Sequence, residues 1–238
     1  MKPRIFYRIT VVIVVFFIIF VSTITCCCGS QSNSDTALSP MSGTVDTIFP
    51  ATISADTLGQ TDFFSQLADS ALTLTKQRVI YDPSYVEIAY PNGDVPANRG
   101  VCTDVVIRSY RKLGIDLQKE VHEDMEANFN RYPKRWGLAQ PDRNIDHRRV
   151  PNLMVFFSGF GTVKEISQRP SDYQPGDIVC WDLNGRGLTH IGIVSKQKSR
   201  DGERNMIIHN IGGGQVLEDC VFDWEIIGHY RYAPSTIK

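Results

Sequence analysis

The 238-residue sequence predicts an α+β domain, with helices first and an antiparallel sheet after them. Up to about residue 130, apolar residues recur every three or four positions, which is the period of amphipathic helices. From about residue 177 onward, short β-branched runs alternate with turn signals, as in β-hairpins. The composition, 42% hydrophobic and 21% charged, is that of a globular chain with its own core. The formal net charge of −1 gives no basic excess, so we expect no nucleic-acid partner.

Residues 1–28 have the pattern of an export signal. Basic residues precede a charge-free run from Ile9 to Ile24, and Cys26 follows as the first of three consecutive cysteines. A cysteine at this place resembles the lipidated first residue of a mature bacterial lipoprotein, although Thr25 stands where Gly, Ala or Ser is usual. The alternative is a retained membrane anchor. In both cases we expect an exported chain of the bacterial cell envelope, held at the membrane by its N-terminus and facing the periplasm or the outside.

Residues 29–60 are predicted to form a flexible linker, because Ser, Thr, Gly and Asp predominate there. The folded domain is then expected at residues 61–238. Its first helix is predicted to begin at Thr61, whose hydroxyl can cap a helix N-terminus, and to bury Phe64 and Leu67.

Two further helices are predicted before the sheet. One runs from Cys102 to Gly114, a residue type that commonly ends helices. The other covers residues 117–129, where apolar side chains recur every fourth position. The stretch 131–153 is rich in Pro, Arg and Asn, so we predict a long connection there.

The C-terminal third is predicted to supply the strands of the sheet. The runs are "DIVCWDL", "THIGIVSK", "NMIIHNI", "GQVLEDCVFDW" and "GHYRY", with "NGRG" and "SRDGE" as hairpin loops. Cys180 and Cys220 fall in two of these predicted strands. An exported protein can join two such cysteines in a disulfide, or bury both as free thiols, and the sequence leaves both alternatives open.

Cys102 is the strongest candidate for chemistry. An attacking thiol needs a lowered pKa, a base within reach and donors for the oxyanion. A helix N-terminus favours the thiolate and lowers a thiol pKa of ~8.5 by one unit or more. The backbone N–H groups of the same helix end can serve as oxyanion donors. We therefore expect Cys102 to be a nucleophile.

His190 and His209 are the candidates for the base. Each lies in a predicted strand, and on adjacent strands the two side chains can face the same side, so that one acts as base and the other orients it. A hydrogen-bonded strand histidine without chemistry is the alternative for each. The presence of both residues beside a candidate nucleophile favours catalysis.

Four motifs together resemble the NlpC-type branch of papain-like cysteine peptidases and amidases. They are "GVCTDVVIRSYRKLGI", "PGDIVCW", "THIGIV" and "MIIHN", in this order. The stretch from about Tyr81 to Tyr232 is also similar to an uncharacterised bacterial family placed in that superfamily. The resemblance implies a papain-like α+β fold, with N-terminal helices packed on an antiparallel sheet.

The resemblance also assigns roles to the candidate residues. Cys102 would be the nucleophile, His190 the general base and His209 the residue that orients the base. Asn210 is the alternative for the third role, because a register change of one residue swaps the faces of a strand.

A support residue for the oxyanion is implied as well. Family members often have a tyrosine about a dozen residues ahead of the cysteine. Tyr90 stands at that spacing and is the preferred candidate, and Tyr85 and Tyr81 are less favoured. The sequence departs from the usual "DCSG" motif, which is "VCTD" here. Thr103 and Asp104 therefore replace the usual Ser and Gly.

Peptidoglycan is the substrate that the resemblance implies, because NlpC-type enzymes cut amide bonds in stem peptides of bacterial cell walls. The reaction needs no cofactor or metal, and we expect a monomer. Arg148 and Arg149, within the 131–153 stretch, are candidates to bind a substrate carboxylate, or else belong to a solvated basic loop. Trp181 is a further substrate-binding candidate, with a buried aromatic as the alternative.

Two functions of other classes stay open. Cys102, His190 and His209 could hold a zinc ion with a water as fourth ligand, although no CxxC or HExxH spacing supports such a site. The same fold could also serve as a non-catalytic module that binds the cell wall or another envelope component.

Overall fold

The computed structural model describes the chain from residue 55 to residue 235, and side chains from residue 63. These residues belong to a single unit, Pro50–Lys238. The predicted export signal, Cys26 and nearly all of the predicted linker lie outside the described residues. Within the described part, no helix is both long and apolar enough to cross a membrane.

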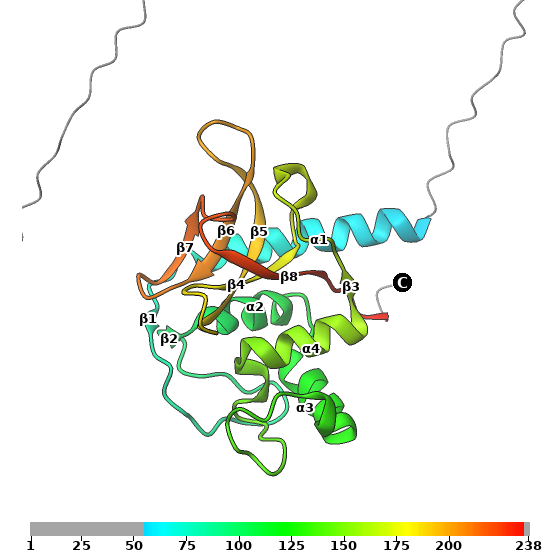
Figure 1. The fold of residues 1–238 in the computed structure, drawn as a ribbon, viewed down its shortest axis with the longest axis vertical. Helices are drawn as coiled ribbons and strands as arrows, with labels where there is room; N and C mark the ends of the chain where they lie inside the picture. Colours follow the sequence, from blue (N-terminus) through cyan, green and yellow to red (C-terminus); the bar gives the residue numbers. More distant parts are fainter. Residues whose placement is uncertain (1–54, 236–238) are drawn as a thin grey trace, which may run out of the picture. The chain divides into compact units, whose positions relative to one another are not determined.

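Helices occupy the first half of the described chain (Figure 1). They are α1 Ala55–Leu74, α2 Cys102–Arg111, α3 Leu117–Asn128 and α4 Val150–Phe160, with short 3₁₀ turns η1 Phe129–Arg131, η2 Asp146–Arg148 and η3 Pro170–Asp172. Helix α1 begins before Thr61, so this residue is not its N-cap, and residues 55–60 of the predicted linker are helical.

Helix α4 begins at the end of the 131–153 stretch, where the sequence predicted a connection, and continues to Phe160, where no element was predicted. Pro151 is tolerated because it stands in the first turn, where backbone N–H groups have no helical partner. The helix buries Leu153, Phe156 and Phe157 at helical spacing. The sequence did not predict this helix, because its apolar repeat is short and follows residues rich in Pro and Arg.

The sheet has six strands in the order β3-β8-β4-β5-β6-β7, and all neighbours are antiparallel. The strands are β3 Thr162–Val163, β4 Ile178–Asp182, β5 Thr189–Lys198, β6 Asn205–Asn210, β7 Gln215–Glu218 and β8 Glu225–Arg231. Two short parallel strands, β1 Ile80–Tyr81 and β2 Arg99–Gly100, form a separate ladder ahead of α2. The α+β class and the predicted hairpins are confirmed.

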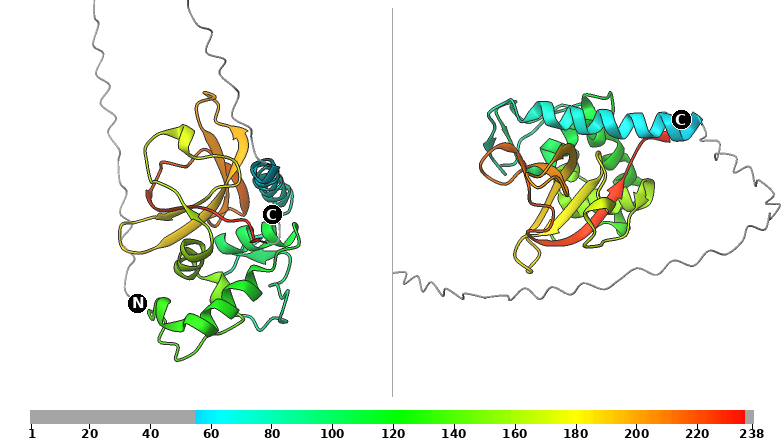
Figure 2. Two further views of the ribbon diagram at one scale, coloured as in Figure 1. Left: turned by 90° about the vertical axis from the view of Figure 1, so that its right-hand side faces the viewer. Right: turned by 90° about the horizontal axis from the view of Figure 1, so that it is seen from above.

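Each face of the sheet carries its own apolar cluster. Helices α1, α2 and α4 all contact β5 and cover one face (Figures 1 and 2). Ile191 and Ile193 of β5 point into this helix-facing core. Side chains alternate along a strand, so His190 points to the opposite face with Val194. There Val194 packs with Trp181 beneath the connecting loops.

Cys180 and Cys220 lie on opposite faces of the sheet. Cys180 belongs to the helix-facing core, whereas Cys220 follows the end of β7 and packs in the other cluster. Both thiols are free and buried. The disulfide alternative is therefore excluded, and the prediction that Cys220 lies in a strand is wrong.

The packing of α1 gives a stability prediction. Leu67 is fully buried between α1 and the sheet, so Leu67→Ala removes a core side chain and leaves a cavity. We expect a loss of about 2–5 kcal/mol in the free energy of unfolding, measured by urea denaturation. Leu188→Ala, at a side chain that is 55% exposed, is the matched control. Equal losses for the two variants would contradict the assigned core.

Candidate functional site

Cys102 is the first residue of α2, as the sequence predicts. The chain reaches it from β2 through Val101, the N-cap, whose backbone is extended (φ −121°, ψ −173°). Gly100 has little room, because a Cβ there would lie 3.1 Å from Oδ2 of Asp104. The strand, the extended N-cap and the helix together hold the Cys102 thiol at the N-terminal end of α2.

Asp104 fixes this helix end. Its Oδ2 accepts a hydrogen bond from the N–H of Val101 at 2.7 Å. Arg148 of η2 donates to both carboxylate oxygens, from Nε to Oδ1 at 3.0 Å and from Nη2 to Oδ2 at 3.1 Å. The two side chains are only 3% and 2% exposed. Arg148 is therefore a structural partner of Asp104 and cannot bind a substrate carboxylate as proposed from the sequence.

Arg149 keeps an accessible guanidinium. It lies over the ring of Trp136, 4.2 Å from the ring centroid, and is half-buried. Partial burial lowers its pKa, although Asp146 and Asp142 oppose the shift. Of the two predicted arginines, this one can still meet a ligand.

His190 and His209 meet on the sheet face opposite the helices. Nε2 of His190 lies 2.8 Å from Nδ1 of His209, and both rings are buried. On the far side of His209, Nε2 lies 3.0 Å from Oε2 of Glu218. The three side chains thus form one hydrogen-bonded chain. Sequence analysis missed Glu218, and the only available signal was its place in the strand that follows His209.

The protons of this chain have one consistent arrangement. An ionised Glu218 only accepts hydrogen bonds, so Nε2 of His209 carries a proton. Nδ1 of His209 then accepts from Nε2–H of His190. This tautomer leaves Nδ1 of His190 with a free lone pair, as a general base requires.

Indole rings enclose the two histidines. The ring centroid of Trp181 lies 5.9 Å from that of His190, and Trp224 lies 6.0 Å from the same ring. Trp181 has no exposed surface, and its Nε1–H donates to the carbonyl of Val221 at 2.9 Å. It therefore limits the movement of His190 from within the core and does not line a cleft for substrate.

The Cys102 thiol lies beside the backbone that follows His190. In the direction of His190, the last register pair between β5 and β6 is Ile193 with Ile208. The N–H of Ile191 is directed at the Cys102 sulfur and favours its thiolate. The helix N-terminus therefore meets the sheet at β5, beside the residue that follows His190.

Asn210, the alternative third residue, has a different partner. Its side-chain amide donates to the carbonyl of Gly100 at 3.3 Å, and its place on β6 alternates with that of His209. Asn210 thus ties the end of β6 to the residues before Cys102. His209, and not Asn210, is the hydrogen-bond partner of His190.

Burial decides the ionisation of the candidate pair. The Cys102 side chain is almost fully buried, and this raises the pKa of its thiol to about 12, although the N–H groups of Ile191, Thr103 and Cys102 oppose the shift. Burial, and then the nearby His209, lower the pKa of His190 to about 3. The predicted lowering of the thiol pKa is therefore wrong in this structure. The pair rests as a neutral thiol and a neutral imidazole.

Tyr81, and not Tyr90, lies near the thiol. Strand β1 pairs Tyr81 with Gly100, two residues before Cys102. Burial raises the pKa of Tyr81, and the charges of Cys102 and Asp104 add to this rise. The ring of Tyr90 instead packs edge-on against His122 of α3, at 5.3 Å between centroids. Spacing along the chain could not reveal the β1–β2 pairing.

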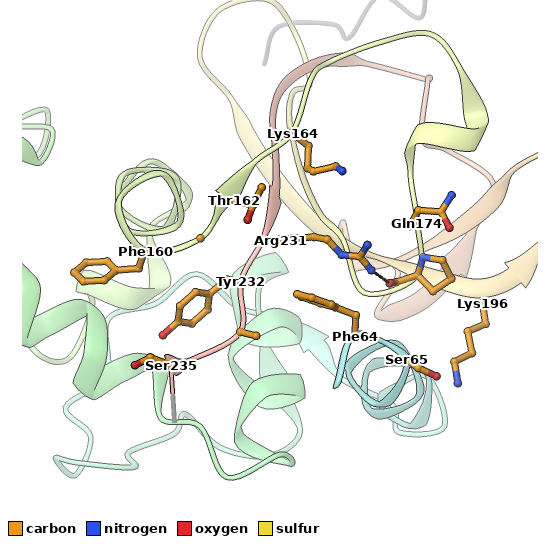
Figure 3. A pocket seen from close by; sticks show the side chains of 13 residues that line it. Phe64, Ser65, Phe160, Thr162, Lys164, Gln174, Lys196, Arg231, Tyr232 and Ser235 are labelled. Atoms are coloured by element: carbon orange, nitrogen blue, oxygen red, sulfur yellow. Dashed lines mark hydrogen bonds between the residues drawn. The ribbon is translucent and has the colours of Figure 1, made fainter. Parts of the chain in front are cut away.

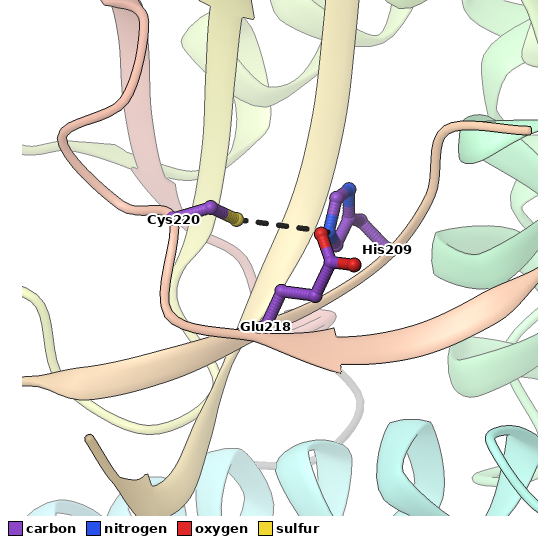
Figure 4. Close-up of side chains that lie close together, drawn as sticks. All are labelled: His209, Glu218 and Cys220. Carbon is purple, nitrogen blue, oxygen red and sulfur yellow. Dashed lines mark hydrogen bonds and ion pairs between the residues drawn. The ribbon is translucent and has the colours of Figure 1, made fainter. Parts of the chain in front are cut away.

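A different set of side chains from the one predicted could hold a metal ion. His209, Glu218 and Cys220 place their ligand atoms within 4.8 Å of one another (Figure 4). Among the described residues, Cys102 and His190 are not part of such a group. The predicted zinc set of Cys102, His190 and His209 is therefore replaced by one that keeps only His209.

A sizeable hollow lies elsewhere on the domain. It has a volume of about 790 Å³ and is lined among others by Phe64, Arg231 and Tyr232 (Figure 3). Neither Cys102 nor the histidine pair lines it. Because this hollow lies apart from the predicted catalytic side chains, the candidate site is defined by those side chains and not by a cavity.

Comparisons with known proteins found one matching family model and a similar bacterial protein. Residues 68–232 match a family model described as Domain of unknown function (DUF1287). The chain is 54% identical over 166 residues to the Uncharacterized protein YijF of Escherichia coli (strain K12), which covers 70% of this chain and 80% of that protein. No solved structure matches the chain.

The buried ion pair gives a second stability prediction. Arg148→Met leaves the Asp104 carboxylate buried without its partner, so we expect a loss of about 3–5 kcal/mol in the free energy of unfolding. Lys196→Met removes an exposed partner of Asp69 and should change it by no more than about 1 kcal/mol. Similar effects in the two variants would show that the Arg148 pair is not structural.

The raised thiol pKa predicts how Cys102 reacts with iodoacetamide. Only the thiolate reacts, and with a pKa of about 12 its fraction grows as pH rises. Between about pH 7 and 9.5 the alkylation rate at Cys102, followed by peptide mass spectrometry, should rise about tenfold per pH unit. In urea the same thiol should level off near its ordinary pKa of ~8.5. A plateau below pH 8.5 in the folded protein would contradict the neutral resting pair.

Proposed function

We propose that this chain, which belongs to the DUF1287 family, a domain of unknown function, is a thiol hydrolase of the bacterial cell envelope. It would cleave amide bonds, in peptidoglycan stem peptides, on an NlpC-type papain-like fold. One observation carries the proposal. A helix-N-terminal cysteine lies beside a strand whose histidine is held by a second histidine and a carboxylate.

The proposed reaction begins from the neutral pair. Nδ1 of His190 takes the thiol proton of Cys102 as the sulfur attacks the amide carbonyl. The imidazolium then gives this proton to the amide nitrogen, the C–N bond breaks, and a thioester remains on Cys102. Water, activated by His190, hydrolyses the thioester and restores the thiol. Because the thiolate is not formed in advance, proton transfer accompanies each attack.

Two kinds of donor are available for the oxyanion. The first N–H groups of α2 point out of the helix end that carries Cys102. The Tyr81 hydroxyl is close enough for its charge to interact with that of Cys102. We assign to Tyr81 the support role that the sequence suggested for Tyr90.

Two further features support the substrate class. The N-terminal run of the sequence predicts export, which would bring the domain to the cell wall. Arg149, stacked on Trp136, presents a planar guanidinium that suits a carboxylate of a stem peptide.

A binding module is the second candidate function. Cys102 is 5% exposed and its thiol is protonated at rest, so a substrate must gain access to it. If no such opening occurs, the same surface would bind the cell wall without cutting it.

Cleavage of peptidoglycan tests the proposal. The full-length protein is incubated with purified peptidoglycan, and soluble products are identified by mass spectrometry. We expect fragments from the wild type, none from Cys102→Ala, and a rate about 10²–10⁴-fold lower for His190→Ala. Cys180→Ser, which alters a buried thiol outside the histidine chain, is the matched control and should leave the products unchanged.

The outcomes separate the two functions. Fragments that persist in Cys102→Ala would overturn the role of the thiol. Sedimentation of the protein with peptidoglycan, without fragments from any variant, would favour the binding module. The fragment masses identify the bond that is cut.

A further inference from the structure

We propose that His209, Glu218 and Cys220 form a binding site for one zinc-like divalent ion, and that the bound ion holds His190 in the tautomer that cannot act as a base. The site itself stands without the proposed hydrolase function. Its inhibitory consequence rests on that function.

Two separations between the ligand atoms are close to those around a tetrahedral ion, and all three atoms lie within 4.8 Å of one another. Nε2 of His209 lies 3.6 Å from Sγ of Cys220 and 3.0 Å from Oε2 of Glu218. With Zn–S near 2.3 Å and Zn–N near 2.0–2.1 Å, tetrahedral geometry separates sulfur and nitrogen by about 3.6 Å. The nitrogen–oxygen pair would need to open by only a few tenths of an ångström.

The fold brings these ligands to one point (Figure 4). Strand β7 pairs Glu218 with Ile207, two residues before His209, so both ligands emerge on the same sheet face. Cys220 follows β7 and turns back toward the sheet. His209 and Cys220 are buried, whereas the Glu218 side chain is 49% exposed. An ion can therefore enter past Glu218, and a water can complete its coordination.

The donor types select the ion. One thiolate, one imidazole and one carboxylate form a mixed set that suits Zn²⁺ and is poor for Mg²⁺ or Ca²⁺, which prefer oxygen ligands. Metal binding replaces the thiol proton of Cys220, and this proton passes to solvent.

The ion would also rearrange the histidine protons. Nε2 of His209 loses its proton to solvent when it binds the metal, and Nδ1 of His209 takes one from Nε2 of His190. Nδ1 of His190 then gains a proton from solvent. The ring remains neutral, but its free lone pair now faces His209, so it cannot accept the Cys102 proton. A bound ion and an active base would exclude each other.

Cobalt provides the direct test, because a Co²⁺–thiolate bond has a charge-transfer band in the near ultraviolet. The metal-free full-length protein is titrated with Co²⁺, with Cys26, Cys27 and Cys28 replaced by serine in every sample so that these thiols cannot contribute a band. We expect one equivalent to produce the band, and Zn²⁺ to abolish it by displacement. Cys220→Ser should lose the band, and Glu218→Gln should weaken binding at least about tenfold. Cys180→Ser and Cys102→Ser, at the other buried thiols, should match the wild type.

The site is overturned if no band appears, or if the band persists in Cys220→Ser. Circular dichroism checks the fold of each variant, and the half-exposed Glu218→Gln keeps the test decisive should Cys220→Ser fail to fold. Wild-type binding by Glu218→Gln would also count against the site. Zn²⁺ that binds at this site without slowing peptidoglycan cleavage would overturn the tautomer switch alone. Absence of cleavage by the metal-free protein would count against the hydrolase function and not against the site.

Discussion

The buried ion pair between Asp104 and Arg148 is the constraint on which the candidate site depends. It joins the first turn of α2 to η2, and Asp104 also accepts the N–H of Val101, so the position of Cys102 is held from both directions. Burying two charges is costly unless their hydrogen bonds are satisfied, and here both carboxylate oxygens are paired. Residues 131–153, which contain η2, thus support the helix that carries Cys102.

The sheet separates the two halves of the proposed chemistry. Cys102 packs with the helix-facing core, and the ring of His190 lies with Trp181 on the other face. The backbone of β5 connects them, because the N–H of Ile191, the residue after His190, is directed at the Cys102 sulfur. This arrangement excludes water from both groups, so desolvation outweighs the helix N-terminus and keeps the thiol protonated. A closed, neutral site of this kind would protect the Cys102 thiol from oxidation.

His209 would connect the proposed catalysis and the proposed metal binding through one ring. Its Nδ1 meets His190, and its Nε2 meets Glu218 and Cys220. A carboxylate at Nε2 sets the proton arrangement that a base needs, and a metal ion at the same nitrogen reverses it. One buried imidazole can therefore be controlled from the half-exposed edge of β7.

The sequence by itself determined the α+β order, the hairpins, the helix that begins at Cys102 and the presence of His190 and His209 in neighbouring strands. These features follow from local periodicity and turn chemistry, which depend only on residues close together in the sequence. Tertiary structure decided the neighbours of Tyr81, Arg148 and Glu218, because these come from other elements of the fold. It also decided the ionisation of the thiol, since desolvation depends on what packs around a group, and no local pattern records that packing.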